Sequence, residues 1–376
     1  MPTPRLRNGD PLPHQSTAEI GSSLIETEQL ERRFAGLLLG TAIGDALGLP
    51  AEGLSPARIQ RRWQGKWQMR LAFGRGMVSD DTEHAFFVAQ SLLASPANSA
   101  GFLRSLAWRM RWWFLGLPAG VGLATARACV KLWLGISPER SGVSSAGNGP
   151  AMRSAIIGAF FADNPQRKRQ FLVASKRLTH TDPRAETAAL AVAEAAVWIV
   201  GRQDELGGFL KRLHACGTGD EWSQICRRLE EAFESKKSVR DFACSLGLER
   251  GVTGYAFHTV PVALYAWLRH PNDYRKALIE ALECGGDTDT VGAIVGALVG
   301  GCVGEQGIPN EWLRNLWEWP RTPEKIRILA RRLARAKEQG QPQRPVAYFW
   351  IGVLPRNLLF LLIVLVHGLR RLFPPY

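Results

Sequence analysis

The sequence predicts an all-α fold over residues 28–335, and three observations support this. Apolar residues recur three and four positions apart along most of the stretch, which is the spacing of one helix face. We find neither a run of alternating apolar and polar residues that would indicate a strand nor an internal repeat. With 46% apolar and 22% charged residues, the chain has the composition of a folded globular protein.

The first predicted helix begins at Leu30, where Leu30, Phe34, Leu37, Leu38 and Ile43 follow the helical spacing. Later helices are predicted over residues 83–94, 102–115, 152–162, 185–200, 223–234, 259–269, 274–283 and 289–303. The first and last of these carry glycine at every fourth position, namely Gly36, Gly40, Gly44, Gly48 and Gly292, Gly296, Gly300. Because glycine costs up to about 1 kcal/mol inside a helix, each stripe indicates the close approach of another backbone.

The two ends of the chain differ in composition from the middle. Residues 1–27 are rich in Pro, Ser, Thr and Arg, and we expect them to form a flexible N-terminal arm. Residues 321–344 hold eight Lys or Arg against two acidic residues, and no acid follows Glu338. We expect residues 336–376 to form a separate hydrophobic tail.

The tail contains two apolar runs, residues 346–354 and 358–366, separated by Pro355 and Arg356. Neither run reaches the roughly 20 residues that a membrane-spanning helix needs. Two interpretations stay open: the tail packs on the main domain or a partner subunit, or it is a re-entrant or surface-lying membrane anchor aided by the basic helix before it. The runs are too apolar for a typical nucleic-acid arm, so we expect no specific nucleic-acid partner.

The cysteine pattern and the N-terminal residues also exclude or disfavour some classes of protein. The net charge is +13, and the six cysteines include no CxxC pair, which excludes a zinc ribbon and disfavours a disulfide-stapled secreted fold. Prolines occupy the N-terminal positions where a signal peptide needs an apolar segment. We therefore expect a cytoplasmic protein, with the tail as the part that would attach to a membrane.

Two acidic motifs stand directly before predicted helices. Ser79-Asp80-Asp81 precedes residues 83–94, and Gly285-Gly286-Asp287-Thr288-Asp289-Thr290 precedes the last glycine stripe. Crowded carboxylates are unfavourable unless a cation relieves their repulsion, and their oxygens, like hydroxyl oxygens, suit Mg²⁺ or Mn²⁺. Each motif alone is also explained as a helix N-cap, an interpretation that the presence of two motifs disfavours.

Two further segments add candidate groups. Gly44-Asp45 and Glu52 lie around the end of the first predicted helix. Gly147-Asn148-Gly149-Pro150 precedes another predicted helix and has the pattern of an anion-binding loop, although a plain loop-to-helix junction explains it as well.

Five segments, in order between Glu31 and Trp312, carry a resemblance: GLLLGTAIGDALGLPAEG, SDDTE, GNGPAMR, LTHTD and GGDTDTVGAIVGALVGG. Together they resemble the ADP-ribosylglycohydrolase family, which includes the dinitrogenase-reductase-activating glycohydrolases. The resemblance implies a compact orthogonal helical bundle with two Mg²⁺ or Mn²⁺ ions in a central cleft. It also implies hydrolysis of the glycosidic bond between ADP-ribose and a protein side chain or small molecule, with arginine as the first expected acceptor.

The resemblance also implies a role for individual residues. One ion is expected to bind Ser79, Asp80, Asp81 and Asp289, and the second Asp287, Asp289 and Thr290. Glu52 and Asp81 are the expected catalytic carboxylates, with exchangeable roles. ADP-ribose is expected to contact Gly147, Asn148, Gly149, Met152 and His180. Ser79 departs from the threonine common in the family, and the segments before Glu31 and after about residue 320 lie outside the resemblance.

An alternative hypothesis is a catalytically silent relative that binds ADP-ribose or serves a structural role. Such a relative is expected to lose some metal-ligand acids. This chain retains Glu52, Asp80, Asp81, Asp287 and Asp289, which favours the enzyme.

Overall fold

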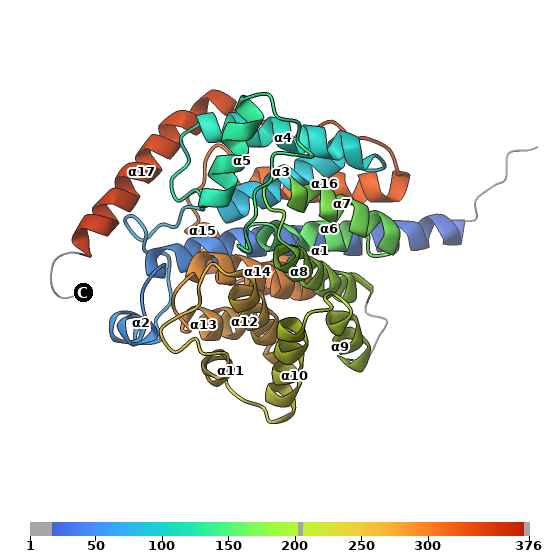
Figure 1. Ribbon diagram of the computed structural model, residues 1–376. Helices are drawn as coiled ribbons and strands as arrows, with labels where there is room; N and C mark the ends of the chain where they lie inside the picture. The colour runs from blue at the N-terminus through green and yellow to red at the C-terminus, as the bar shows by residue number, and fades with distance from the viewer. Residues whose placement is uncertain (1–16, 202–205, 372–376) are drawn as a thin grey trace, which may run out of the picture.

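The computed structural model describes residues 17–201 and 206–371, which form helices and isolated β-bridges without any strand (Figure 1). The α-helices are α1 (Thr17–Gly48), α2 (Pro56–Trp63), α3 (Asp80–Ala94), α4 (Ser99–Leu115), α5 (Leu123–Trp133), α6 (Ala155–Phe160), α7 (Pro165–Arg177), α8 (Pro183–Gly201), α9 (Leu206–His214), α10 (Asp220–Glu234), α11 (Val239–Ser245), α12 (Ala256–Arg269), α13 (Tyr274–Leu282), α14 (Thr288–Val303), α15 (Asn310–Arg314), α16 (Pro323–Gln339) and α17 (Val353–Arg370). Short 3₁₀ helices cover Leu49–Ala51, Ala151–Arg153, Glu305–Gly307 and Trp350–Gly352. The predicted all-α fold is confirmed.

The two glycine stripes form the centre of the molecule, where α1 and α14 run side by side (Figure 1). A Cβ atom on Gly40 would lie 2.0 Å from the carbonyl oxygen of Gly296, and one on Gly296 would lie 2.1 Å from that of Gly40. Gly36 faces Gly300 and Gly44 faces Gly292 in the same way, so the two helices are antiparallel. This pairing brings the C-terminal end of α1 beside the N-terminal end of α14.

We expect Gly40→Ala to lower the free energy of unfolding by about 1–3 kcal/mol, because the new methyl group forces two backbones apart. Helix propensity alone predicts the opposite sign. Gly368→Ala in α17 is the matched control, since nothing lies within 4 Å of a Cβ atom there. Urea denaturation measures both variants. A Gly40→Ala protein as stable as the wild type would contradict the close contact.

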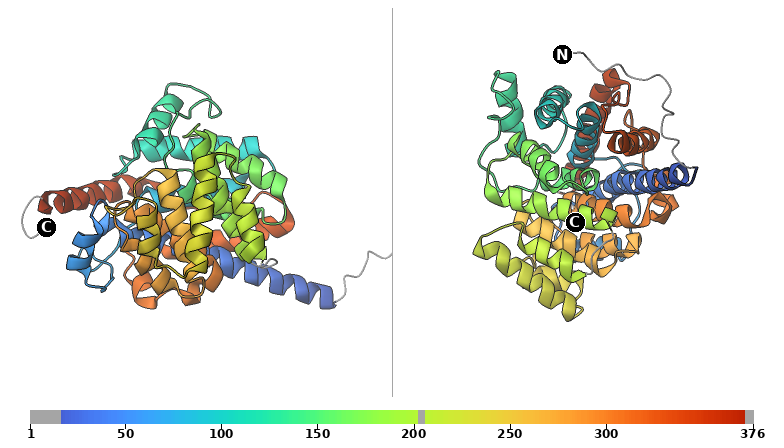
Figure 2. Two further views of the ribbon diagram at one scale, coloured as in Figure 1. Left: turned by 60° about the horizontal axis from the view of Figure 1, so that its bottom comes forward. Right: turned by 90° about the vertical axis from the view of Figure 1, so that its right-hand side faces the viewer.

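Several boundaries differ from the prediction. Helix α1 begins at Thr17, so residues 17–27 of the expected arm are helical, and Figure 2 shows this end of α1 projecting from the body. Once the buried part of a helix has formed, each added residue gains a hydrogen bond without a new nucleation cost. Residues 1–16 lie outside the described part. The periodicity missed α2, α5, α7, α9, α11 and α15, and the helix predicted at 152–162 is divided between Ala151–Arg153 and α6.

The inner face of α17 packs on the rest of the protein, as the first interpretation of the tail expects. Arg356 is 4% exposed, and its Nη2 donates to Glu318 Oε2 at 2.6 Å and to the Val78 carbonyl at 2.7 Å. Asn357 donates to the carbonyl of Gly116 at 2.7 Å, and Phe360 is buried. In the described residues, two stretches are long and apolar enough to cross a membrane: Glu26–Ala51, whose most apolar part is buried, and Trp350–Arg370, mostly exposed.

Candidate active site

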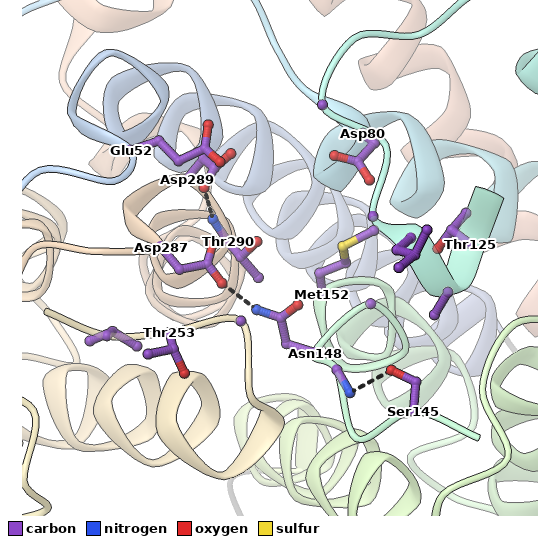
Figure 3. Close-up of a pocket in the computed structure, with 18 of the residues that line it drawn as sticks. Glu52, Asp80, Thr125, Ser145, Asn148, Met152, Thr253, Asp287, Asp289 and Thr290 are labelled. Carbon is purple, nitrogen blue, oxygen red and sulfur yellow. Dashed lines mark hydrogen bonds between the residues drawn. The ribbon is translucent and has the colours of Figure 1, made fainter. Parts of the chain in front are cut away.

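A pocket of about 510 Å³ opens where the residues after α1, the start of α3, the loop before α6 and the start of α14 meet (Figure 3). The predicted site residues that line it are Glu52, Asp80, Gly147, Asn148, Gly149, Met152, His180, Asp287, Asp289 and Thr290. Asp80 faces Glu52 and Asp289 across this pocket (Figure 3). The predicted ligands Ser79 and Asp81 are buried beside the pocket and do not line it.

The start of α14 is set by a sharp turn at Gly285 and Gly286, whose φ angles are +71° and +81°. A Cβ atom on Gly286 would lie 1.8 Å from the carbonyl oxygen of Val252, so only glycine fits there. The turn delivers Asp287 and Asp289 to the pocket from the first residues of the helix. The glycine pair therefore sets the position of both acids.

The start of α3 is held by Asp45 of α1, which is completely buried. Its carboxylate accepts hydrogen bonds from the Ser79 amide at 2.9 Å, the Thr82 amide at 3.1 Å and the Thr82 hydroxyl at 2.5 Å. From the sequence, Asp45 was identified only as an acid beside a glycine. A carboxylate from one helix thus fixes the N-terminus of another, and with it the position of Asp80.

Asp81 connects α3 to α14. Its Oδ2 accepts hydrogen bonds from the hydroxyl of Ser79 at 3.1 Å and from that of Thr290 at 3.2 Å. The Ser79 hydroxyl also accepts the Asp81 amide at 3.3 Å, so Ser79 is the N-cap of α3, as the alternative interpretation of this motif expects. The two acidic motifs, more than 200 residues apart in sequence, meet through this contact.

The clustered acids resist ionisation. Burial raises the pKa of Asp80 to about 8, with an added contribution from the charge of Asp45, and burial raises the pKa of Asp45 to about 6. Burial likewise raises the pKa of Asp81 and of Asp289 well above the usual range, and neighbouring carboxylates add to both shifts. A cation placed among these groups would favour their charged forms.

The donor atoms at this end of the molecule fit a hard divalent cation. Asp81 Oδ1 is buried without a hydrogen-bond partner, which is costly unless another positive group satisfies it. The remaining donors are carboxylate and hydroxyl oxygens, the ligands that Mg²⁺ and Mn²⁺ prefer. Across residues 17–201 and 206–371, no three His, Cys, Asp or Glu side chains converge as a metal site does. The two ions stay a prediction.

The Gly147-Asn148-Gly149 loop forms the opposite wall. Asn148 Nδ2 donates to Asp287 Oδ2 at 2.6 Å and to the Thr259 hydroxyl at 2.9 Å, which ties the loop to both α14 and α12. A Cβ atom on Gly149 would lie 3.0 Å from His180 Cε1, so the glycine lets this ring approach the loop. Burial, aided by the charge of Arg153, lowers the pKa of His180 to about 3, and the ring is neutral at neutral pH.

Glu52 follows the short helix after α1 and is exposed to the pocket. Its carbonyl oxygen accepts a hydrogen bond from Arg371 Nη1 at 2.7 Å, and Arg371 Nη2 donates to the carbonyl of Pro50 at 3.2 Å. Partial burial raises the pKa of Glu52, Asp287 raises it further, and Arg371 opposes the shift. The end of α17 therefore supports the backbone that carries Glu52.

Sequence reasoning missed several polar residues of the site. Thr125, Ser145 and Thr253 line the pocket from loops and from α5. Arg371 lies outside the region of family resemblance, and Thr259 sits on a helix predicted only by its apolar spacing. None of these residues carries a motif, so only the three-dimensional structure identifies them.

His84 is a buried residue of α3, close in sequence to Asp80 and Asp81, and it leads to a prediction about how stability depends on pH. It is completely buried, packs edge-on against Trp113 at 4.5 Å, and lies 3.5 Å from Arg153 Nη1. Burial and Arg153 lower its pKa well below 6.5, so below that pH the unfolded chain binds a proton that the folded chain does not. Above pH ~6.5, His84 is neutral in both the folded and the unfolded chain and does not lower the free energy of unfolding. As the pH falls below that value, protonation of His84 in the unfolded chain lowers the free energy of unfolding.

Accordingly, we expect His84→Gln to reduce the slope of unfolding free energy against pH between about 4 and 6 by up to about 1.4 kcal/mol per pH unit. Urea denaturation at a series of pH values measures this slope for both proteins. Equal slopes would show that His84 takes up its proton over the same pH range in the folded and unfolded chains and would contradict the prediction.

Comparisons with known proteins identify the family of this chain. The profile of the ADP-ribosylglycohydrolase family matches residues 26–343. An ADP-ribosyl-[dinitrogen reductase] glycohydrolase of Rhodospirillum rubrum is 27% identical, with 76% of this chain and 90% of the relative aligned. An ADP-ribosylarginine hydrolase Tri1 of Pseudomonas putida is also 27% identical, over 80% of this chain and 78% of the relative.

Among solved structures, a chain of an ADP-ribosylglycohydrolase-related protein complex superposes with a TM-score of 0.61 at 26% identity. The match covers 82% of this chain and 99% of that one. The helical architecture, the paired acidic helix starts and these matches agree with one another. The chain belongs to the ADP-ribosylglycohydrolase family and is a glycohydrolase.

Proposed function

We propose that this enzyme hydrolyses the glycosidic bond between ADP-ribose and an arginine side chain of a protein, with two divalent cations in the pocket. The observation that carries the proposal is the antiparallel pairing of α1 with α14, which gathers Glu52, Asp80, Asp287 and Asp289 around one pocket. Arginine is the first choice of acceptor because the name of one relative specifies ADP-ribosylarginine. A small ADP-ribosylated molecule is the alternative substrate.

The acidic motifs would hold the two ions, Mg²⁺ or Mn²⁺. Ser79, Asp80, Asp81 and Asp289 would bind one, and Asp287, Asp289 and Thr290 the other. When bound, the ions supply positive charge for the ribose oxygens as the glycosidic bond breaks. Support comes from the orphaned Oδ1 of Asp81 and from the raised pKa values of the surrounding acids.

Glu52 is the better candidate for proton transfer. Asp81 is 1% exposed and already accepts hydrogen bonds from two hydroxyl groups. Its position therefore suits a residue that holds the site together better than one that exchanges protons with water. Glu52 is open to the pocket, where a water molecule can reach it, and its pKa is raised toward the range useful for a general acid or base. We assign the removal of a proton from the attacking water to Glu52.

The loop of Gly147, Asn148 and Gly149 is proposed to receive the phosphates of ADP-ribose. Its glycines leave the backbone accessible on the pocket side, and Asn148 orients Asp287 through the 2.6 Å hydrogen bond. A neutral His180 and Met152 would contact the ribose and its surroundings. No negative charge from the loop opposes the phosphates.

The test is release of free ADP-ribose from arginine-ADP-ribosylated protein by the full chain with Mg²⁺, with Mn²⁺ and with EDTA. We expect metal-dependent release that Asp287→Ala abolishes. Release from a serine-linked or small-molecule substrate alone would move the proposal to that acceptor. Tight ADP-ribose binding with no release from any substrate would identify a catalytically silent relative and refute the proposed hydrolysis.

We also propose that the enzyme works in the cytoplasm, where its six cysteines stay reduced thiols. Its partner there would be an ADP-ribosylated protein or small molecule.

A further inference from the structure

Exposed large apolar side chains are confined to one part of the described surface. They occur at Phe73, in α4, α5 and their flanking loops between residues 108 and 134, at Trp317 and Trp319, and between residues 349 and 369. Helices α7 to α14 contribute none among their described residues. Isolated exposed apolar residues are ordinary, whereas a concentration of this kind marks a surface that binds something.

Helix α17 has one face buried on the domain and an apolar face that is exposed. The inner face carries Arg356, Asn357 and Phe360, which are buried against the domain. The outer face carries Leu354, Leu358, Leu359, Leu362, Leu365, Val366 and Leu369, each at least 40% exposed. A helix on the surface of a soluble protein normally turns a polar face to water, so this outer face calls for a covering partner.

Two of the other exposed segments touch α17 or the turn before it. Gly116, between the exposed Leu115 and Leu117, accepts a hydrogen bond from Asn357 at 2.7 Å. The ring of Trp319 lies 5.9 Å from that of Phe349, and Trp319 also packs on Gly352. Figure 1 shows α4, α5 and α17 along the same upper side of the molecule. We call these segments the α17 surface: residues 108–134, 317–319 and 349–369.

The sequence around the α17 surface is basic. Residues 97–138 contain five Lys or Arg and no acid. The chain after Glu338 contains four Arg and no acid; one of them, Arg356, is buried in a pair with Glu318, which leaves Arg344, Arg370 and Arg371. Trp108, Trp112, Trp133, Trp317, Trp319 and Trp350 are all exposed on it. Indole rings favour the boundary between water and lipid, and Lys and Arg favour anionic headgroups.

We propose that the α17 surface binds an anionic lipid bilayer, with α17 lying along the bilayer and not crossing it. The buried ion pair of Arg356 with Glu318 and the contact of Asn357 with Gly116 hold one face of α17 on the protein. A spanning helix would have to break both contacts and carry Arg356 into lipid. A second protein copy would bring a second basic surface against the first, which like-charge repulsion disfavours.

This orientation also places the pocket at the edge of the membrane contact. Leu123 is 65% exposed and lines the pocket, and Arg371, just after α17, hydrogen-bonds the backbone of Glu52. The enzyme would therefore meet ADP-ribosylated groups presented at a membrane surface. This last point rests on the proposed function, whereas the lipid contact does not.

Vesicle co-sedimentation of the full chain, without metal or substrate, tests the lipid contact independently of hydrolysis. The variant is Leu358→Glu, Leu362→Glu and Leu365→Glu together. The control is Gln166→Glu, Gln170→Glu and Gln224→Glu, which makes the same charge change at exposed sites on α7 and α10. We expect the wild type and the control to bind vesicles containing phosphatidylserine at least about tenfold more tightly than phosphatidylcholine vesicles, and the α17 variant to lose about tenfold or more.

Four results would overturn the proposal. The first is a wild type that binds neither kind of vesicle, and the second is an α17 variant that binds as tightly as the wild type. A C-terminal tag protected from protease added outside the vesicles would show that α17 crosses the bilayer. A dimer in light scattering that the α17 variant dissociates, with no vesicle binding, would show that a second copy covers this surface.

Discussion

Replacing Asp289 by asparagine is expected to lower kcat/KM by about a thousandfold or more while the protein stays folded. Asp289 is 6% exposed at the start of α14, and Glu52, Asp287 and Asp81 all raise its pKa in addition to burial. It would help to hold both proposed cations, so loss of its charge would remove transition-state stabilisation worth several kcal/mol. Asparagine keeps the shape and removes the negative charge.

The matched control is Asp220→Asn, an exposed acid in the first turn of α10. We expect it to hydrolyse ADP-ribosylated arginine at the wild-type rate. Thermal unfolding without metal should show Asp289→Asn to be at least as stable as the wild type, because it removes one of several crowded carboxylates. Retention of a tenth or more of wild-type kcat/KM would contradict the role given to Asp289.

The second large effect is expected from Arg356→Ala, which should destabilise the protein by about 3–5 kcal/mol. Arg356 pairs with Glu318 at 2.6 Å and also faces Glu83, and both acids are less than 5% exposed. Removing the guanidinium leaves Glu318 buried without its positive partner. Urea denaturation of the full chain measures the change.

A second substitution separates the lost charge pair from lost packing. We expect Arg356→Ala with Glu318→Gln to recover a large part of the stability that Arg356→Ala alone loses, because the buried acid is then neutral. Equal destabilisation in the single and double variants would assign the effect to the packing of the Arg356 side chain on Phe360, 4.7 Å away.

The centre of the fold was predictable because its signal is local and repeated. Gly36 to Gly48 and Gly292 to Gly300 mark the contact between α1 and α14, and the acids beside each stripe mark the pocket. The direction of pairing was not predictable, since glycine spacing is the same read in either direction. The contact of Gly36 with Gly300 shows that the two helices are antiparallel, and this places Glu52 and Asp289 at the same end of the helix pair.

Features that depend on polar contacts between residues far apart in the sequence could not be predicted from the sequence. Nothing local to Asn148 indicates its hydrogen bond to Asp287, and nothing local to Arg356 indicates a buried pair with Glu318. The inner face of α17 was equally hidden, because leucines that pack on protein and leucines that face outward have the same composition. Helix α7 was missed because its apolar positions are few, and α5 was missed because apolar residues lie on its exposed side as well as its buried side, which leaves no clear stripe.

The most direct test of the site is calorimetric titration of Mn²⁺ into the metal-free full chain. We expect two ions to bind per wild-type chain, Asp220→Asn to titrate as the wild type does, and Asp289→Asn to lose stoichiometric binding, since its side chain is proposed to contact both ions. A wild-type chain that binds no Mn²⁺, or an Asp289→Asn chain that binds two ions with unchanged affinity, would contradict the proposed centre.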